Sequence, residues 1–300
     1  MSVSVVILAA GAGTRMKSNL PKVLHRICGK PMLFYSIDEA LNLSDDVHIV
    51  LFHQESLVKE KIIESYPKAC ESEALHFHIQ DYENYPGTGG AIMQGGSGEK
   101  AKHCFAYKYE QILILNGDMP LVRSQTLKKL CENPSKIVMS ILHLENPNGY
   151  GRVILGHNKV QKIIEQKDAT QEELAIKDVN AGVYKIHKNI LESYLPLLQN
   201  NNNQKEFYLT DVIFYAGQNG VEVAAVQVEE FMGVNSKLQL SLAQEVILKR
   251  LRDAAMEEGV IMHLPHTIYI ESGVKFSGEC IVEQGVQILG NCEIINSHIK

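Results

Sequence analysis

The sequence has no excess of basic residues, no paired-cysteine motif and no apolar run long enough to cross a membrane. Lys and Arg number 29 against 35 Asp and Glu, so the formal net charge of −6 provides no general attraction for nucleic acid or anionic membranes. The six cysteines form no CxxC pair, which favours a reduced, cytoplasmic setting. Val3 to Ala10 is too short for a membrane span and lacks a basic leader, so we expect a soluble chain.

Two familiar phosphate-binding loops are also absent near the N-terminus. A Rossmann fingerprint and a Walker A loop would both need glycine at Met16. A short β-branched strand is nevertheless followed by Gly11 and Gly13, whose backbone amides can approach an anion closely. Arg15 then adds a guanidinium group that can bind a phosphate through two nitrogens, and Lys22 adds an ammonium group on a flexible side chain. This order predicts a local phosphate site; the alternative is an ordinary turn with two solvated cations.

Apolar runs alternate with amphipathic stretches through the first part of the chain. Beyond the first strand, strands are expected at residues 47–52, 75–79, 112–115 and 137–144. This alternation predicts an α/β fold with a parallel, doubly wound sheet. Ligands of such sheets bind beyond the carboxyl ends of the strands, where Gly11, Gln80 and Asp118 would all lie. We also expect a helix and then a surface excursion between Gly87 and Lys108, and a polar loop at 200–203.

The C-terminal part has a different pattern. The 300 residues exceed the usual size of a single core, so a second, smaller domain is expected, joined by a helix over 235–258. Apolar residues then recur every six positions in two registers: Ile268, Val274, Cys280, Val286, Cys292 and His298, and Ile270, Phe276, Val282, Ile288 and Ile294. This period predicts a β-helix; chance spacing in β-hairpins is the alternative. Only about two coils fit, so we expect further coils beyond Lys300.

Two polar groups follow predicted strands at the ligand edge. Asp118 ends the run ILILNGD, where its carboxylate could hold Mg²⁺ together with substrate phosphates, or cap a turn. Gln80 and the Gly87-Thr88 pair could read the edge of a base, or form a core amide and a plain loop.

Further candidates lie later in the chain. The segments around Gly151, Glu165 and Asn180 supply an amide, a carboxylate and a carboxamide suited to sugar hydroxyls, although each alone is typical of a surface turn.

His76 and His78 share one strand face, but a metal site there has no third ligand nearby in the sequence. No nucleophilic Ser or Cys arrangement stands out.

The motifs together resemble a known family. LAAGAGTRM, PKVLH and GKPM are followed in order by QxxxxxxGTG, NGDMPL, GYGR, EQKDA, VNAG, FYLTD and GVNSKLQLS. This series is similar to the nucleotidylyltransferases that join a sugar 1-phosphate to a nucleoside triphosphate. It is closest to their bacterial bifunctional branch, which makes UDP-N-acetylglucosamine and also acetylates glucosamine 1-phosphate.

The resemblance implies an architecture. Residues 1–229 would form the uridylyltransferase domain, with a Rossmann-like doubly wound mixed sheet of the nucleotide-diphospho-sugar transferase type. Residues 230–263 would form a linker with a long helix, and 264–300 the first coils of a left-handed β-helix. The full-length protein would be a homotrimer through that β-helix, and this chain would lack acetyltransferase activity.

The resemblance also assigns roles to residues. Arg15 and Lys22 would be catalytic, and Asp118 and Asn235 would hold Mg²⁺. Asn235 would also contact the sugar, together with Gly151, Glu165 and Asn180. The nucleotide site would comprise Leu8, Ala9, Ala10, Gly11, Gly13, Lys22, Gln80, Gly87, Thr88, Asn116 and Gly117.

The implied reaction transfers UMP from UTP to N-acetylglucosamine 1-phosphate and releases pyrophosphate, supplying a precursor of peptidoglycan and lipopolysaccharide. Alternatives are another sugar-1-phosphate nucleotidylyltransferase, such as one for glucose 1-phosphate, and a non-catalytic nucleotide-sensing subunit. The chain departs from the family's pattern in two places: Gly90 stands where a histidine is expected, and the loop at 81–86 is longer than usual. Contacts with the base or the sugar could differ there.

Overall fold

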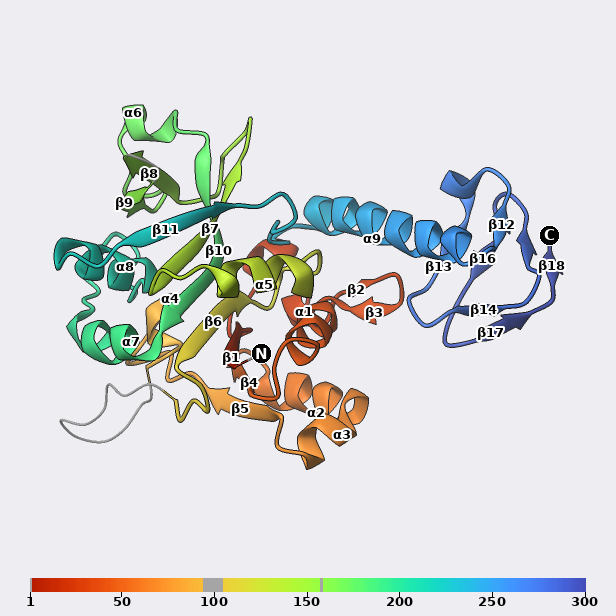
Figure 1. The fold of residues 1–300 in the computed structure, drawn as a ribbon, viewed down its shortest axis with the longest axis horizontal. Coiled ribbons are helices and arrows are strands. Elements are labelled where there is room, and N and C mark those ends of the chain that lie inside the picture. Colours follow the sequence, from red (N-terminus) through yellow and green to blue (C-terminus); the bar gives the residue numbers. More distant parts are fainter. Residues whose placement is uncertain (1, 94–104, 157–158) are drawn as a thin grey trace.

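The computed structural model describes residues 2–93, 105–156 and 159–300. Much of the excursion expected between Gly87 and Lys108 lies outside these residues. The described residues form a mixed sheet in the order β5-β4-β1-β6-β10-β7-β11-β9-β8 (Figure 1). Its strands are β1 (Val3–Leu8), β4 (Val47–Leu51), β5 (Leu75–Ile79), β6 (Gln111–Asn116), β7 (Ile137–His143), β8 (Arg152–Gly156), β9 (Lys159–Ile164), β10 (Asp178–His187) and β11 (Val223–Gln227).

The half of the sheet that carries the N-terminus is parallel. β1 pairs in parallel with both β4 and β6, and β4 pairs in parallel with β5. The predicted parallel sheet is confirmed for these four strands. Beyond them the sheet is mixed, because β10 runs antiparallel to both β6 and β7.

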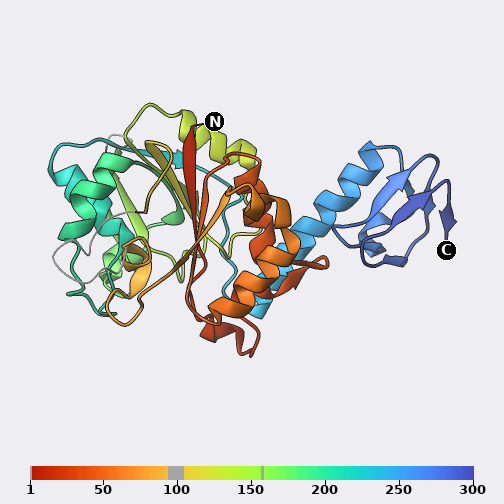
Figure 2. The same ribbon diagram turned by 90° about the horizontal axis from the view of Figure 1, so that it is seen from below.

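Helices cover both faces of the sheet, as Figure 2 also shows. Val5 and Ile7 of β1 pack in one core with residues of α1, α2 and α5, whereas Val6 packs in a second core with residues of α7 and α8. This alternation follows from the two-residue period of a strand buried on both sides. The helices are α1 (Met32–Leu41), α2 (Glu55–Ser65), α3 (Pro67–Glu71), α4 (Gly87–Gly90), α5 (Ser124–Glu132), α6 (Gln171–Leu174), α7 (Lys188–Tyr194), α8 (Leu209–Gln218) and α9 (Lys237–Glu257).

The helix expected after Gly87 is only the four-residue α4. The predicted helix over 235–258 is confirmed as α9, which begins after Ser236; the Ser236 hydroxyl accepts a hydrogen bond from the backbone N–H of Gln239 at 3.2 Å. None of the helices in the described ranges combines the length and apolarity that crossing a bilayer requires.

Helix α9 leads from the sheet to the C-terminal part (Figure 1). It packs Ala243 and Ile247 against Ile27, which lies in the small hairpin of β2 (Arg26–Ile27) and β3 (Lys30–Pro31). A backbone hydrogen bond of 2.9 Å from Ser272 to Cys28 also joins this hairpin to the C-terminal part.

Short parallel strands build the C-terminal part. They are β12 (Ile261–Met262), β13 (Tyr269–Ile270), β14 (Lys275–Ser277), β15 (Ile281–Val282), β16 (Gln287–Ile288), β17 (Glu293–Ile295) and β18 (His298–Ile299). Tyr269 pairs with Gln287 and Lys275 with Glu293, so both pairs are offset by 18 residues, or three hexads.

The hexad residues form the apolar interior of this part, with one exception. Ile270, Val282 and Ile288 are among its buried members. The six-residue register ends at His298, which is exposed, and Ile299 joins the apolar cluster instead. The reason is a shorter last coil, in which Val282 pairs with Ile299.

Candidate active site

A cavity of about 310 Å³ opens at the carboxyl edge of the parallel strands. Its wall contains most of the residues that the sequence predicted for nucleotide and metal binding. These are Leu8, Ala9, Ala10, Gly11, Lys22, Gln80, Gly87, Thr88, Asn116 and Asp118. Gly13, Gly117 and the predicted metal ligand Asn235 are not part of the wall. Glu165 lines a separate, neighbouring pocket with Asp168 and Asp211.

Gly11 and Gly13 differ in why the structure needs glycine at each position. Gly13 has a left-handed φ of 61°, and a Cβ there would lie 2.4 Å from Cβ of Lys22, so the glycine makes room for the lysine side chain. Gly11 has no left-handed φ, and a Cβ there would meet no atom within 4 Å. The turn therefore depends on Gly13, whereas Gly11 leaves its side of the cavity open to a ligand. Met16, which excludes the two familiar loops, is fully buried.

Four polar side chains meet beside the cavity. Lys22 Nζ forms a close ion pair with Asp118 Oδ2 and donates to Asn235 Oδ1 at 3.1 Å. Arg15 Nη2 donates to the same Asn235 oxygen at 2.8 Å. The side chains of Lys22 and Asp118 are each 12% exposed, so water screens this pair only weakly. The predicted catalytic cations and metal ligands therefore lie together.

Asn235 reaches this cluster from a segment fixed at both ends. Val234 donates its backbone N–H to the Asp118 carbonyl at 2.8 Å, and Asn235 N–H donates to Gln239 Oε1 of α9 at 2.8 Å. The start of α9 is thus attached directly to the end of β6. Asp118 and Asn235 present two oxygens to one cation, the Lys22 ammonium, and such hard oxygen donors suit Mg²⁺.

Gln80 holds the loop above the cavity. Its side-chain nitrogen donates to the carbonyls of Tyr85 at 2.8 Å and Gly87 at 3.0 Å, and the side chain is buried. The amide nitrogen of Gln80 therefore supports the loop rather than facing a ligand. The hydroxyl oxygen of Thr88 accepts a hydrogen bond from the backbone N–H of Leu209 at 3.1 Å, which ties the same loop to α8.

Gly90 and the longer 81–86 loop belong to one structural feature. A Cβ at residue 90 would lie 2.0 Å from the carbonyl oxygen of Tyr85, a distance that real Cβ atoms do not show. The loop therefore occupies the space that a side chain at position 90 would need. The two departures from the family's pattern explain each other.

Two aromatic residues at the cavity were not predicted from the sequence. Phe52 and Tyr82 line it, are 38% and 41% exposed, and stack with ring centroids 4.9 Å apart. Phe52 ended a predicted strand at the ligand edge, which was an available signal. Tyr82 lies in the longer loop, whose course no periodicity predicts. Glu206 also lines the cavity and was not predicted.

The three candidate sugar ligands also lie together. Asn180 donates its backbone N–H to the Gly151 carbonyl at 2.9 Å. A Cβ at Gly151 would lie 3.4 Å from both carboxylate oxygens of Glu165, so these two residues are neighbours. Gly151 and Glu165 flank β8 and β9, whereas Asn180 lies within β10 at a register shift.

This group adjoins the nucleotide cavity through β10. Gly182 has a φ of 80°, and a Cβ there would lie 2.7 Å from the side-chain nitrogen of Asn116. Asn116 lines the cavity at the end of β6, the strand that pairs with β10. Burial, followed by the charge of Asp118, raises the pKa of Tyr150.

Burial and mutual repulsion affect the carboxylates of the neighbouring pocket. Burial, followed by Asp168, Asp211 and Glu206, raises the pKa of Glu165. Burial and Asp168 raise the pKa of Asp211 to about 6. The pocket therefore favours the protonated form of these carboxyl groups, which can donate a hydrogen bond, and disfavours additional negative charge.

Replacing Gly90 by alanine is expected to lower the free energy of unfolding by about 1 to 3 kcal/mol, the usual cost of overpacking, because Tyr85 must move. Gly217→Ala in α8 is the control, since a Cβ at position 217 meets nothing within 4 Å and alanine favours helix. Urea unfolding measures both. Equal stability of Gly90→Ala and the unchanged chain would contradict the packing described.

Asp211→Asn tests the raised pKa of Asp211. A raised pKa in the folded state stabilises the fold below the unfolded pKa of about 4, and this contribution is lost as pH rises through about 6. The neutral asparagine avoids that loss. The free energy of unfolding of Asp211→Asn, relative to that of the unchanged chain, should therefore be higher at about pH 7.5 than at about pH 4. Urea unfolding at both pH values, with Asp253→Asn in α9 as control, where the side chain is 44% exposed, measures the difference. A relative stability independent of pH would refute the assignment.

Residues 5–180, more than half of the chain, match the profile of the MobA-like NTP transferase domain. The bifunctional protein GlmU of Helicobacter hepaticus is 69% identical over 98% of this chain and 65% of its own length. The bifunctional protein GlmU of Nitratiruptor sp. is 50% identical over 100% of this chain and 66% of its own length. This chain thus spans slightly less than two thirds of these relatives.

Solved structures agree on the fold. The HddC structure from Yersinia pseudotuberculosis complexed with GMP-PN has a TM-score of 0.59 at 21% identity, covering 82% of this chain and 100% of its own. A UDP-glucose pyrophosphorylase complexed with UDP-glucose has a TM-score of 0.61 at 20% identity, covering 83% and 100%. The profile match and the shared fold lead to one conclusion: this chain belongs to the MobA-like NTP transferase family.

Proposed function

We propose that this chain transfers UMP from UTP to N-acetylglucosamine 1-phosphate, forming UDP-N-acetylglucosamine and pyrophosphate. The observation that carries the proposal is the cluster of Arg15, Lys22, Asp118 and Asn235 beside the nucleotide cavity. A cluster with two cations and two metal-binding oxygens suits a triphosphate in a chain that has no overall positive charge. The high identity to relatives named GlmU supports the choice of substrates.

The cavity is suited to a nucleoside. Backbone from Leu8 to Gly11 would line the uridine site, with Gly87 and Thr88 opposite. Gln80 would act by holding the loop in place, since its amide nitrogen is bound to two loop carbonyls. Phe52 and Tyr82 offer apolar ring surface at the cavity wall.

The sugar would lie next to the cavity, against Gly151, Glu165 and Asn180. Carboxylate and amide groups suit sugar hydroxyls and an acetamido group because they accept and donate hydrogen bonds. Asn235 would contribute at the junction of the two subsites, where it already binds both Arg15 and Lys22.

Catalysis would depend on orientation and on neutralising charge. Arg15 and Lys22 would hold the phosphates in line for attack by the sugar phosphate oxygen on the α-phosphorus, with pyrophosphate as the leaving group. Asp118 and Asn235 would hold Mg²⁺, which supplies further positive charge to the phosphate oxygens. No covalent enzyme intermediate is required for this transfer.

We further propose that the parallel ladders between Ile261 and Ile299 are the first coils of a left-handed β-helix. The offset of three hexads in two ladders and the apolar interior support this. The domain limits at 229 and 263, the homotrimer, and an acetyltransferase site in coils beyond Lys300 remain predictions.

Pyrophosphate release from UTP tests the proposed function directly. Release should require N-acetylglucosamine 1-phosphate and Mg²⁺, and glucose 1-phosphate should support it much more weakly. A preference for glucose 1-phosphate would instead identify a different sugar nucleotidylyltransferase. Absence of release with either sugar would reject catalysis and favour a nucleotide-sensing role.

Arg15→Ala should lower kcat by about two orders of magnitude or more, the scale found when one transition-state donor is removed. Arg26→Ala is the control, since Arg26 is an exposed cation of the β2–β3 hairpin. Steady-state pyrophosphate release measures both variants. An Arg15→Ala enzyme with unchanged kcat would remove this residue from the mechanism.

A further inference from the structure

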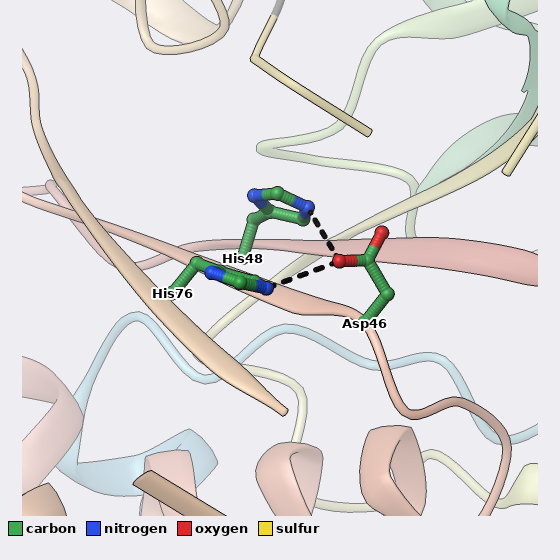
Figure 3. A group of neighbouring side chains, drawn as sticks. All are labelled: Asp46, His48 and His76. Carbon is green, nitrogen blue, oxygen red and sulfur yellow. Dashed lines mark ion pairs between the residues drawn. The ribbon is translucent and has the colours of Figure 1, made fainter. Parts of the chain in front are cut away.

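A second polar cluster lies at the opposite end of β4 from the nucleotide cavity. Asp46 precedes β4, His48 lies within it, and His76 lies beside His48 on the edge strand β5 (Figure 3). Phe52 at the cavity follows His48 by four residue steps of extended chain, a distance of about 13 Å. The cluster is therefore separate from the proposed catalytic site, and its role is independent of the proposed function.

Three potential ligand atoms converge in this cluster. One oxygen and two nitrogens, Asp46 Oδ1, His48 Nε2 and His76 Nε2, lie within 4.8 Å of one another. The Asp46 oxygen is 3.3 Å from His48 Nε2 and 3.1 Å from His76 Nε2. In a tetrahedral zinc site with bonds of about 2.0 to 2.1 Å, neighbouring ligand atoms lie about 3.3 Å apart. The two measured separations match this spacing.

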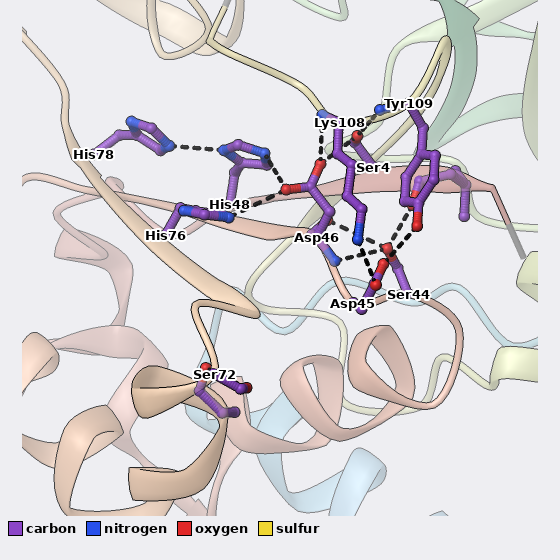
Figure 4. A network of polar contacts seen from close by, with 12 residues as sticks. Ser4, Ser44, Asp45, Asp46, His48, Ser72, His76, His78, Lys108 and Tyr109 are labelled. Atoms are coloured by element: carbon purple, nitrogen blue, oxygen red, sulfur yellow. Dashed lines mark hydrogen bonds and ion pairs between the residues drawn. The ribbon is translucent and has the colours of Figure 1, made fainter.

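Outer contacts fix the orientation of two of these ligands (Figure 4). The other oxygen of Asp46 accepts hydrogen bonds from the Ser4 hydroxyl and from the backbone N–H of Lys108, the latter at 3.0 Å. The other ring nitrogen of His48, Nδ1, is 2.9 Å from His78 Nε2. Protein metal sites show the same arrangement, in which the second atom of each ligand is held by a hydrogen bond.

The inner nitrogen of His48 is held less well. His48 is 2% exposed, and its Nε2 faces Asp46 Oδ1 at 3.3 Å, an ion-pair contact without hydrogen-bond geometry (Figure 3). A buried ring nitrogen with only a long, poorly aligned contact is unfavourable. An ion placed between His48 and Asp46 would bind this nitrogen. His76 is 37% exposed, so the ion could reach the cluster from solvent past its side chain.

We propose that Asp46, His48 and His76 bind one divalent transition-metal ion of the zinc class, with water as the fourth ligand. Two imidazole nitrogens and one carboxylate oxygen suit such an ion, whereas Mg²⁺ prefers oxygen ligands alone. The ion joins β4 to the edge strand β5, and through Asp46 to the segment that contains Lys108. Its role is structural: it fixes the edge of the sheet.

Zinc titration of the chelator-treated chain tests the proposal. We expect about one equivalent of Zn²⁺ to bind and to raise Tm by several degrees at saturation, and an equal concentration of Mg²⁺ not to displace it. His76→Gln should weaken Zn²⁺ binding by more than about tenfold and abolish the rise in Tm. Its partly exposed position makes this substitution compatible with folding.

His143→Gln is the matched control. His143 is also a partly exposed histidine on the sheet, and it pairs with Asp178 at 2.7 Å. The groups of three potential ligands found in the described residues do not include this pair. His143→Gln should therefore bind Zn²⁺ as the unchanged chain does. Equal loss of binding in both variants would overturn the proposal, since it would indicate nonspecific histidine binding.

Co²⁺ gives an independent spectroscopic readout. It should produce the visible bands of a tetrahedral nitrogen and oxygen site, without thiolate charge transfer, and His76→Gln should lose them. Thiolate bands would assign the ion to the free cysteines instead. The absence of both Zn²⁺ binding and Co²⁺ bands would leave a plain hydrogen-bonded Asp–His cluster and refute the proposal.

Discussion

One ammonium group, that of Lys22, connects the segments on which the active site depends. It binds Asp118, 96 residues away in the sequence, and Asn235, 213 residues away. Each partner is positioned by a different element: Lys22 by the turn at Gly13, Asp118 by the end of β6, and Asn235 by the start of α9. Because this contact is only 12% exposed, an unpaired member would cost several kcal/mol, so the site forms as a unit.

The parallel sheet separates the chemistry at its two ends. Its carboxyl edge carries a cavity with open backbone at Gly11, where a ligand can approach, and a charge cluster in which each cation already has an oxygen partner. The amino end of β4 carries a tighter cluster of imidazole and carboxylate around Asp46. The first arrangement suits a substrate that is exchanged, and the second suits an ion that stays.

Local sequence signals predicted much of this architecture. β-branched runs located the parallel strands, and the Gly13 turn and the polar residues after β1, β5 and β6 located the ligand edge, because strand ends meet there by topology. Asn235 came from family resemblance alone, since its role depends on a hydrogen bond to α9. The link between Gly90 and Tyr85, the Phe52–Tyr82 pair and the approach of His48 to His76 are contacts between segments, which no local pattern encodes.

Lys22 and Asp118 act as one charged unit, and the proposed mechanism depends on this coupling more than on any other contact. A double-mutant cycle with Lys22→Met, Asp118→Asn and the double variant, measured as kcat/KM for pyrophosphate release, tests it most directly. Residues in direct contact typically show coupling energies of about 0.5 to 3 kcal/mol, and we predict a value above about 1 kcal/mol. Additive effects of the two substitutions would contradict the claim.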